Sequence, residues 1–530
     1  MTMRAVLLSS AVVLLVVSLF ITSSTSFVLA LVGPLTLVPI IFTALFLLLH
    51  VTELMSKEKR PPIAGLLLLL LLHFNRIYDY QTSLAKKLRT FRLIMPFRSE
   101  VFTADPANIE YILKTNFPNY GKGSHNYKVL EDLVGDGIVA VDGEKWRHQR
   151  KLASYEFSTR NLRVYSSAVF RGSAAKLVSQ VTIMAAAEQA MDLQDMLMKS
   201  TLDSMFKVGF GVELNTLSGS DVFWNRFTKA LDDAAAIVLR RYVDPLWRVK
   251  RFLNIGLEAA LKRNIKIIDD AIFELIRCKR EQMKSENLVR EKEDLLSRFM
   301  MESEKDPINM TDKYLRDFIF SFMLAGKDTS SNTLTWFFYM LCKHPLVQDK
   351  VVNEVIEATQ AKDKYICPDE FSSLMTEGAL EKMQFLHAAI TETLRLYPAV
   401  GSDSKMTVED DILPDGYLVK KGDPVSYMPY AMGRMTYIWG EDAEEYRPER
   451  WLENGIFRPE SPFKFTAFQG GPRICIGKEF AYRQMKILAA FLLYFFQFRL
   501  VDETKEATYK IAFSLHLAEG LKVYALPRAG

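Results

Sequence analysis

The chain of 530 residues has few cysteines, few histidines and almost no excess charge. It contains four cysteines and seven histidines, and its formal net charge at pH 7 is +4. Cysteines this sparse and this far apart exclude a disulfide-stapled fold and a zinc site of paired cysteines. The histidines form no His-Glu-x-x-His motif, and the small positive charge gives no support to nucleic-acid binding. We therefore expect most of the chain to lie in a reducing compartment and to bind no nucleic acid.

The chain also lacks linkers and repeats. No tract rich in glycine, serine or proline divides it, so we expect one large domain rather than the roughly three that length alone suggests. No dinucleotide-binding glycine fingerprint follows a strand pattern, so NADPH or a flavin would have to bind another protein. Short strand patterns surround the turns near Tyr417 and Val425. We predict a mainly α fold with small peripheral β-sheets, whose helices include 156–175, 187–210, 256–283, 312–343, 345–359, 383–396 and 478–496.

Charged residues are missing from the start of the chain. Between Ala5 and Thr52 there is no Asp, Glu, Lys or Arg, and about 20 apolar residues suffice to cross a bilayer. We predict an N-terminal transmembrane anchor at residues 1–52, which crosses the membrane once or twice. A cleaved signal peptide, with small residues at Val28 and Ala30, is the alternative, but the apolar stretch continues well beyond that site.

Basic residues follow the predicted anchor. Lys57, Lys59 and Arg60 favour a cytosolic position for the chain after them, because positive charge collects on the cytosolic side of a membrane. We assign residues 53–74 to a hinge and membrane-proximal segment, and residues 75–530 to the large domain.

One cysteine lies in a distinctive local sequence. Residues 468–477 read Phe-Gln-Gly-Gly-Pro-Arg-Ile-Cys-Ile-Gly, which places Cys475 in a glycine-rich turn before an apolar helical pattern. Backbone N–H groups of a tight turn and the positive end of the next helix stabilise a thiolate, the form of cysteine that binds a metal. A phosphate-binding loop is excluded because Pro472 and Glu479 replace the glycine and the hydroxyl that it requires. An ordinary buried cysteine is the remaining alternative.

A second motif lies within a long helical pattern that contains no proline. Residues 325–330 read Ala-Gly-Lys-Asp-Thr-Ser. Glycine inside a helix costs about 1 kcal/mol relative to alanine, so Gly326 requires a reason. Asp328 and Thr329, an acid beside an alcohol, can hold and transfer protons. The alternative is a helix that Gly326 and back-bonded hydroxyl groups merely kink.

Two further motifs place polar groups on helix faces. Glu392 and Arg395 are three residues apart and share one face, although such pairs are usually surface features. Trp146 and Arg150 are four residues apart and direct an indole N–H and a guanidinium to one side of a helix. Neither spacing by itself indicates a particular function.

With these motifs in order from Trp146 to Gly477, the chain resembles the cytochrome P450 family. The haem-binding signature of that family is Phe, two residues, Gly, one residue, Arg, one residue, Cys, one residue, Gly, and every fixed position is matched. The resemblance implies a haem-thiolate monooxygenase with the cytochrome P450 fold. Its cofactor would be non-covalent haem b, with Cys475 as the axial ligand of the iron. The other haem-binding residues would be Phe468, Gly471, Arg473, Trp146 and Arg150.

The same resemblance assigns roles to the remaining motifs. Asp328 and Thr329 would be catalytic residues that deliver protons for the activation of O2. Glu392, Arg395 and Arg450 would form a buried structural cluster behind the haem. Electrons would come from NADPH through NADPH–cytochrome P450 reductase. The basic residues expected on the face that binds this reductase are Arg147, Arg150, Lys151, Lys478, Arg483 and Lys486.

Within the family, several segments resemble plant-type fatty-acid ω-hydroxylases. This resemblance implies hydroxylation of a long-chain fatty acid at or near its terminal carbon, beside lipid of the endoplasmic reticulum membrane. Ala325 occupies the position of a glutamate that esterifies the haem in animal-type relatives, so no covalent link is expected. One alternative function is that of a sterol or terpenoid hydroxylase. The other is an isomerase or dehydratase of lipid hydroperoxides, but such an enzyme would not need the acid–alcohol pair. The resembling segments are Gly137–Trp146, Tyr430–Met435, Phe463–Gln469 and Phe480–Lys486.

Overall fold

The computed structural model describes residues 58–66, 73–94, 99–219, 222–285, 294–361 and 366–528. The chain divides into two units, Met1–Lys59 with Ile94–Ser99 and Arg60–Leu93 with Glu100–Gly530. The architecture below is that of the second unit. The predicted anchor at residues 1–52 lies outside the described residues, among which no helix is both long and apolar enough to cross a membrane.

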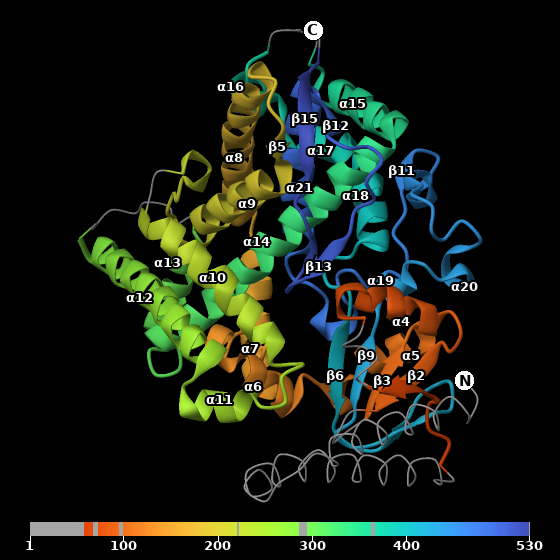
Figure 1. Cartoon of the computed structure of the whole chain (residues 1–530). Coiled ribbons are helices and arrows are strands. Elements are labelled where there is room, and N and C mark those ends of the chain that lie inside the picture. The colour runs from red at the N-terminus through yellow and green to blue at the C-terminus, as the bar shows by residue number, and fades with distance from the viewer. Residues whose placement is uncertain are drawn as a thin grey trace, which may run out of the picture. The chain divides into compact units, whose positions relative to one another are not determined.

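The longest helix, α14 (Asp312–Lys343), runs through the centre of the second unit (Figure 1). Thr311 caps its start by accepting a hydrogen bond from the backbone N–H of Tyr314 at 3.3 Å, and the next helix begins at Pro345. A helix of 32 residues is about 48 Å long. Its residues are buried on every face, so other elements must surround it. The main helices against it are α9 (Leu193–Phe210), α18 (Gln384–Leu396) and α21 (Lys478–Phe495).

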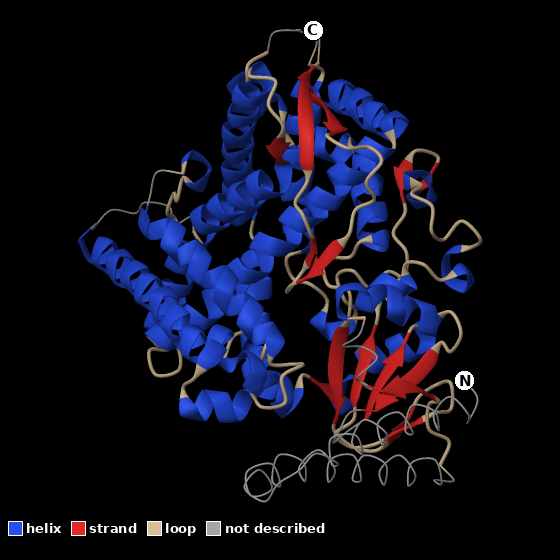
Figure 2. Cartoon of the chain, viewed as in Figure 1, coloured by secondary structure: helices blue, strands red, loops and turns tan. Residues whose placement is uncertain are grey.

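Helices make up most of the unit (Figure 2). Those not yet named are α4 (Ile77–Ala85), α5 (Pro106–Glu110), α6 (Gly123–Val134), α7 (Gly143–Ser158), α8 (Arg160–Ala186), α10 (Val222–Arg240), α11 (Trp247–Leu253), α12 (Gly256–Ser285), α13 (Leu295–Lys305), α15 (Pro345–Thr359), α16 (Pro368–Leu374), α17 (Glu377–Lys382), α19 (Pro429–Met432) and α20 (Thr436–Trp439).

Two predicted helices have different bounds in the structure. The helix predicted at 156–175 is wrong at its start, because Thr159 is extended and its hydroxyl accepts the N–H of Leu162 to cap a new helix. The helix predicted at 187–210 begins only at Leu193, because Asp192 caps it. The other predicted helices are confirmed to within two residues at each end.

The described strands form one six-stranded sheet and four smaller sheets. In the large sheet the order is β1-β2-β3-β9-β6-β4, with Val101 of β3 opposite Val425 of β9 in a parallel pair. A parallel pair requires a long connection, and here the helical part of the chain provides it. The predicted architecture of many helices with small sheets is therefore confirmed.

The strands are β1 (Ile63–Leu66), β2 (Thr90–Ile94), β3 (Ser99–Thr103), β4 (Tyr120–Gly121), β5 (Met191–Asp192), β6 (Asp403–Thr407), β7 (Asp411–Ile412), β8 (Leu418–Val419), β9 (Pro424–Tyr427), β10 (Leu452–Glu453), β11 (Ile456–Phe457), β12 (Phe496–Leu500), β13 (Tyr509–Ile511), β14 (Leu515–Leu517) and β15 (Lys522–Pro527).

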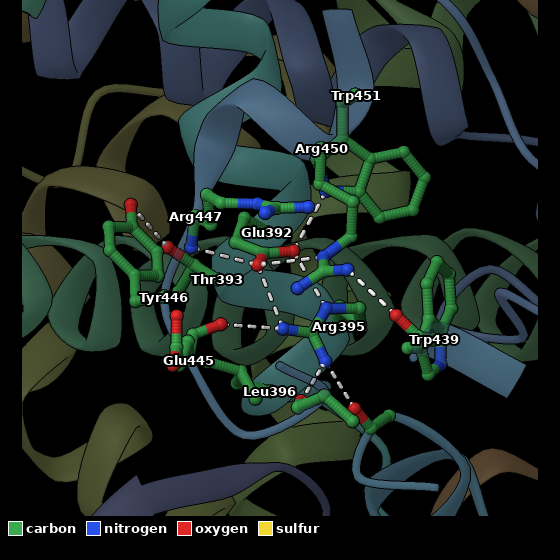
Figure 3. A network of polar contacts seen from close by, with 12 residues as sticks. Glu392, Thr393, Arg395, Leu396, Trp439, Glu445, Tyr446, Arg447, Arg450 and Trp451 are labelled. Atoms are coloured by element: carbon green, nitrogen blue, oxygen red, sulfur yellow. Dashed lines mark hydrogen bonds and ion pairs between the residues drawn. The ribbon is translucent and has the colours of Figure 1, made fainter. Parts of the chain in front are cut away.

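A buried charge cluster joins α18 to the segment before β10 (Figure 3). Arg395 donates from Nε and Nη2 to the two carboxylate oxygens of Glu392, at 2.7 and 2.8 Å. Arg450 Nε lies 3.4 Å from Glu392 Oε1, and the indole N–H of Trp451 donates to Glu392 Oε2 at 2.9 Å. The predicted cluster of Glu392, Arg395 and Arg450 is therefore confirmed as one network.

Backbone carbonyl groups complete this cluster. Arg395 and Arg450 direct their remaining N–H groups to the loop that crosses α18, so few donors stay unpaired. A Cβ at Gly433 would lie 1.9 Å from the carbonyl oxygen of Arg395, so only glycine permits this close approach. The network thus fixes the loop on α18. The accepting carbonyl groups are those of Gly433, Trp439, Asp442, Ala443 and Glu445.

Candidate active site

The turn that carries Cys475 is held by its own backbone. A short 3₁₀ helix spans Gly471–Arg473, and the N–H of Cys475 donates to the carbonyl of Phe468 at 2.8 Å. Gly471 has a φ of +63°, and a Cβ there would lie 1.9 Å from the carbonyl oxygen of Leu113. Any other residue would be strained and would clash with backbone, which accounts for the glycine that the sequence motif requires. Helix α21 starts three residues after the cysteine.

The environment of the Cys475 sulfur only partly favours a thiolate. The side chain of Cys475 is in contact with solvent, but protein atoms surround most of the sulfur. This loss of hydration raises the pKa of the thiol. The N–H of Gly477 and the charges of Arg150 and Lys478 lower the pKa without outweighing burial. A metal cation at the sulfur would complete the stabilisation of the thiolate. The site therefore fits a metal ligand.

Three predicted haem-binding residues lie together beside this turn. The Arg473 guanidinium stacks on the ring of Trp146, 4.4 Å from its centroid, and donates to the carbonyl of Val141 at 3.0 Å. Arg150 donates to the carbonyl of Ile474 at 2.6 Å, next to the cysteine. The Nε of Arg473 is buried and has no hydrogen-bond partner among the described residues. A buried donor of this kind requires an acceptor, and a carboxylate would supply one.

A second group of charges, which the sequence analysis missed, lies near Arg473. The ammonium groups of Lys405 and Lys122 lie 2.7 and 3.0 Å from the carboxylate of Asp403. Burial, with Lys122 and Arg473 as further causes, lowers the pKa of Lys405 to about 7 although Asp403 opposes this shift. Three cations thus surround Asp403 and Asp142, the partner of Arg473. One more anion would be stabilised here.

The acid–alcohol pair lies where α14 is accessible. Ala325 is exposed and Thr329 is half-buried, although most of α14 is buried on all sides. The Thr329 hydroxyl donates to the carbonyl of Ala325 at 2.6 Å. Asp328 is buried beside it. The neighbouring acid–alcohol pair does not fully explain the glycine at position 326. Helix α9 packs Met205 against it, 2.4 Å from where a Cβ would lie.

A shared aromatic neighbour connects α14 to the cysteine turn. The ring of Phe157 lies 5.2 Å from that of Phe322 on α14 and 5.8 Å from that of Phe480 on α21. Phe157 also lies 3.9 Å from the position of a Cβ at Gly477. The predicted thiolate ligand and the predicted proton-delivery pair therefore belong to elements that pack around one ring. Their catalytic roles stay predictions.

A family model described as cytochrome P450 matches residues 56–520. The chain belongs to the cytochrome P450 family. It is 49% identical to cytochrome P450 704C1 of Pinus taeda over 89% of this chain and 93% of that protein. It is 43% identical to cytochrome P450 704B1 of Arabidopsis thaliana, over 88% and 94%, and 38% identical to cytochrome P450 94A2 of Vicia sativa, over 82% and 83%. The chain is therefore a cytochrome P450 monooxygenase.

The cofactor of this family is haem with a cysteine thiolate ligand, and its electrons come from NADPH through a reductase. The residues of this cytochrome P450 fit the cofactor. Cys475 offers the ligand, and Arg473, Lys122 and Lys405 offer positive charge and a free donor to one propionate. When bound, the haem supplies the activation of O2 that inserts one oxygen atom into a C–H bond of a lipophilic substrate.

The protein's own residues have other tasks in this reaction. The helices packed around α14 exclude water from most of its length. Asp328 and Thr329, whose roles stay predictions, would hold and transfer protons beside the accessible stretch of α14. Arg150 fixes the carbonyl next to Cys475 and places positive charge near its sulfur.

The predicted surface for the reductase requires one correction. Lys486 is buried, its ammonium donates to the carbonyl of Leu380, and burial lowers its pKa to about 8. Arg483 is paired with Glu377 at 3.0 Å. Lys486 faces the core because its position on α21 lies on the buried side of that helix. It cannot contact a partner protein.

Proposed function

We propose that this cytochrome P450 hydroxylates long-chain fatty acids at or near the terminal carbon. The main support is sequence similarity, since the segments that resemble plant-type fatty-acid ω-hydroxylases lie on both sides of the cysteine turn. The accessible stretch of α14 adds to it, because the apolar residues Leu324 and Ala325 lie about one helical turn before the acid–alcohol pair. A terminal C–H bond is stronger than its neighbours, so selective attack requires a channel that positions one chain end.

Purified enzyme with reductase and NADPH tests this proposal. Long-chain fatty acids are expected to shift the ferric haem towards high spin, and mass spectrometry is expected to find the added hydroxyl group at the chain end. Sterols and terpenoids serve as the comparison, because they would require a wider pocket. If sterols shift the spin state while fatty acids neither bind nor react, the substrate proposal fails and the monooxygenase assignment stands.

We further propose that the protein lies in the endoplasmic reticulum membrane with its catalytic domain in the cytosol. The uncharged N-terminal stretch supports this proposal, as does an exposed apolar surface around α11. Phe252 is 88% exposed there, beside Arg248 and Lys250. Apolar side chains flanked by basic ones suit the interface of an anionic membrane. The exposed apolar residues of this surface are Leu246, Val249, Phe252, Leu253 and Ile255.

Protease protection of microsomes that contain the full chain tests this location. We expect the chain to resist extraction by alkaline carbonate and its catalytic domain to be digested from the cytosolic side. The exposed Asn309 of the Asn-Met-Thr sequence should then carry no glycan, because glycosylation occurs in the lumen. A protected and glycosylated catalytic domain would contradict the proposal.

A further inference from the structure

A buried lysine lies next to the acid–alcohol pair. Only 2% of the Lys327 side chain is exposed. Lysine is almost never buried unless an acidic group pairs with it, because an isolated ammonium loses its hydration. The position of Lys327 in the middle of α14, directly before Asp328, therefore requires an explanation.

Lys327 joins two carboxylates that differ in exposure. Its Nζ lies 2.6 Å from Oδ1 of Asp232 on α10 and 3.0 Å from Oδ1 of Asp328 on α14. The side chain of Asp232 is 50% exposed, whereas that of Asp328 is 10% exposed. A chain of alternating charges thus leads from solvent at α10 to a carboxylate in the core.

Lys327 provides the counter-charge of Asp328. Among the residues that the structure describes, Lys327 is the one cation paired with Asp328. The two groups are close but poorly aligned, so Asp328 Oδ1 still has no hydrogen-bond donor in the described chain and can accept one. A carboxylate that is buried without a cation takes up a proton more readily.

Lys327 itself stays charged. Burial alone would lower its pKa, but Asp328 and Asp232 outweigh burial and hold the pKa of Lys327 above its ordinary value. From β14, His516 faces the same three charges, and burial lowers the pKa of this imidazole below its ordinary value. Lys510 on β13 also acts on His516. The fixed positive charge next to Asp328 is therefore that of Lys327.

The backbone of α14 does not fix the acid by itself. The carbonyl of Lys327 accepts hydroxyl groups of Ser331 at 2.9 Å and of Thr201 at 3.2 Å. The carbonyl of Asp328 accepts the amide of Asn332 at 2.8 Å. Side-chain donors that compete for helix carbonyls loosen and bend a helix. For the Asp328 side chain, the contact that the structure describes is the ion pair with Lys327.

We propose that Lys327 is a positioning residue that keeps the Asp328 carboxylate ionised and in place beside Thr329, and that Asp232 holds Lys327 from α10. The proposal rests on the predicted role of Asp328 and Thr329 in proton delivery. Lys327 does not transfer a proton in this scheme, because it stays protonated. It keeps Asp328 able to accept a proton from solvent and release it towards Thr329. The position of α10 then influences the supply of protons.

Variants of the full-length holoenzyme test the proposal. Lys327→Met removes the charge, Lys327→Arg keeps it, and Asp232→Asn removes the outer partner. The matched controls are Lys343→Met, at the C-terminal end of the same helix where 29% of this side chain is exposed, and Asp233→Asn, the exposed neighbour of Asp232 on α10.

Two measurements are made on each variant. The first is product formed per NADPH consumed as a function of pH. Lys327→Met should lower this ratio roughly tenfold at neutral pH and recover part of it at higher pH, where an uncompensated carboxyl ionises again. Asp232→Asn should have a smaller effect in the same direction, and Lys327→Arg and both controls should stay near wild type.

The second measurement is infrared difference spectroscopy, which does not depend on turnover. Lys327→Met should show a band of a protonated carboxyl group at neutral pH, and this band should vanish in the double variant Lys327→Met/Asp328→Asn. If Lys327→Met lowers only the thermal midpoint and leaves the pH profile and the spectrum unchanged, Lys327 is merely structural and the proposal is overturned. If Asp328→Asn leaves the product ratio unchanged, proton delivery by this acid fails, and the infrared band still decides whether Lys327 controls its charge.

Discussion

Replacement of Cys475 by serine is expected to abolish monooxygenase activity. The neutral hydroxyl of serine cannot replace the thiolate as an electron-donating ligand of the haem iron. The reduced wild-type enzyme with carbon monoxide should show the red-shifted Soret band of thiolate ligation, and Cys475→Ser should lack it. The turn itself should persist, because the backbone bond from Cys475 to Phe468 and the glycine at position 471 are unchanged.

Cys342→Ser is the matched control for this change. Burial raises the pKa of the Cys342 thiol to about 12, so this sulfur is neutral and unsuited to bind iron. The variant should keep the Soret band and most of the activity. Retention of the band in Cys475→Ser, or its loss in Cys342→Ser alone, would disprove the assignment of the ligand.

The second large effect is expected from Glu392→Gln, in the buried charge cluster. The amide keeps the shape of the side chain but leaves the guanidinium of Arg395, which has no exposed surface, without its counter-charge. Breaking a buried ion pair in this way costs about 3–5 kcal/mol of unfolding free energy. We expect the midpoint of denaturant unfolding to fall and most of the purified chain to lack haem.

Glu449→Gln controls for the loss of a carboxylate in the same region. Glu449 is 45% exposed and pairs with Lys350 on the surface at 2.6 Å. Exposed pairs contribute about 0–1 kcal/mol, so the unfolding midpoint should change little. Equal effects of the two substitutions would show that the buried network contributes no more than a surface pair.

The parts of the structure that depend on local sequence could be predicted. Helix α14 follows from an apolar pattern that no proline interrupts. The glycine at position 471 belongs to the turn motif, but the close contact that requires it is with the distant Leu113. The buried Glu392 cluster required the family motif, because a glutamate three residues before an arginine is usually found on a surface.

Other features depend on contacts that local sequence does not encode. The cluster of Lys122, Asp403 and Lys405 joins β6 to the start of α6, which is distant in the chain. The sequence does indicate one part of this cluster, because Asp403 and Lys405 are two residues apart on a strand and so share one face. Lys486 resembled a surface charge because spacing alone does not show which face of α21 is covered. The break at Thr159 does not follow from helical periodicity, because a threonine can lie within a helix or cap one, and here its hydroxyl accepts the N–H of Leu162.

The parallel pairing of β3 with β9 also has a consequence for the synthesis of this protein. Val101 and its partner Val425 are about 320 residues apart in the chain, and contacts this distant form late in folding. At roughly 5–20 residues per second on the ribosome, β3 waits about 15–60 s for its neighbour. During that interval β3, which carries Val101 and Phe102, has an unpaired edge, so chaperones that bind the nascent chain should increase the yield of folded protein.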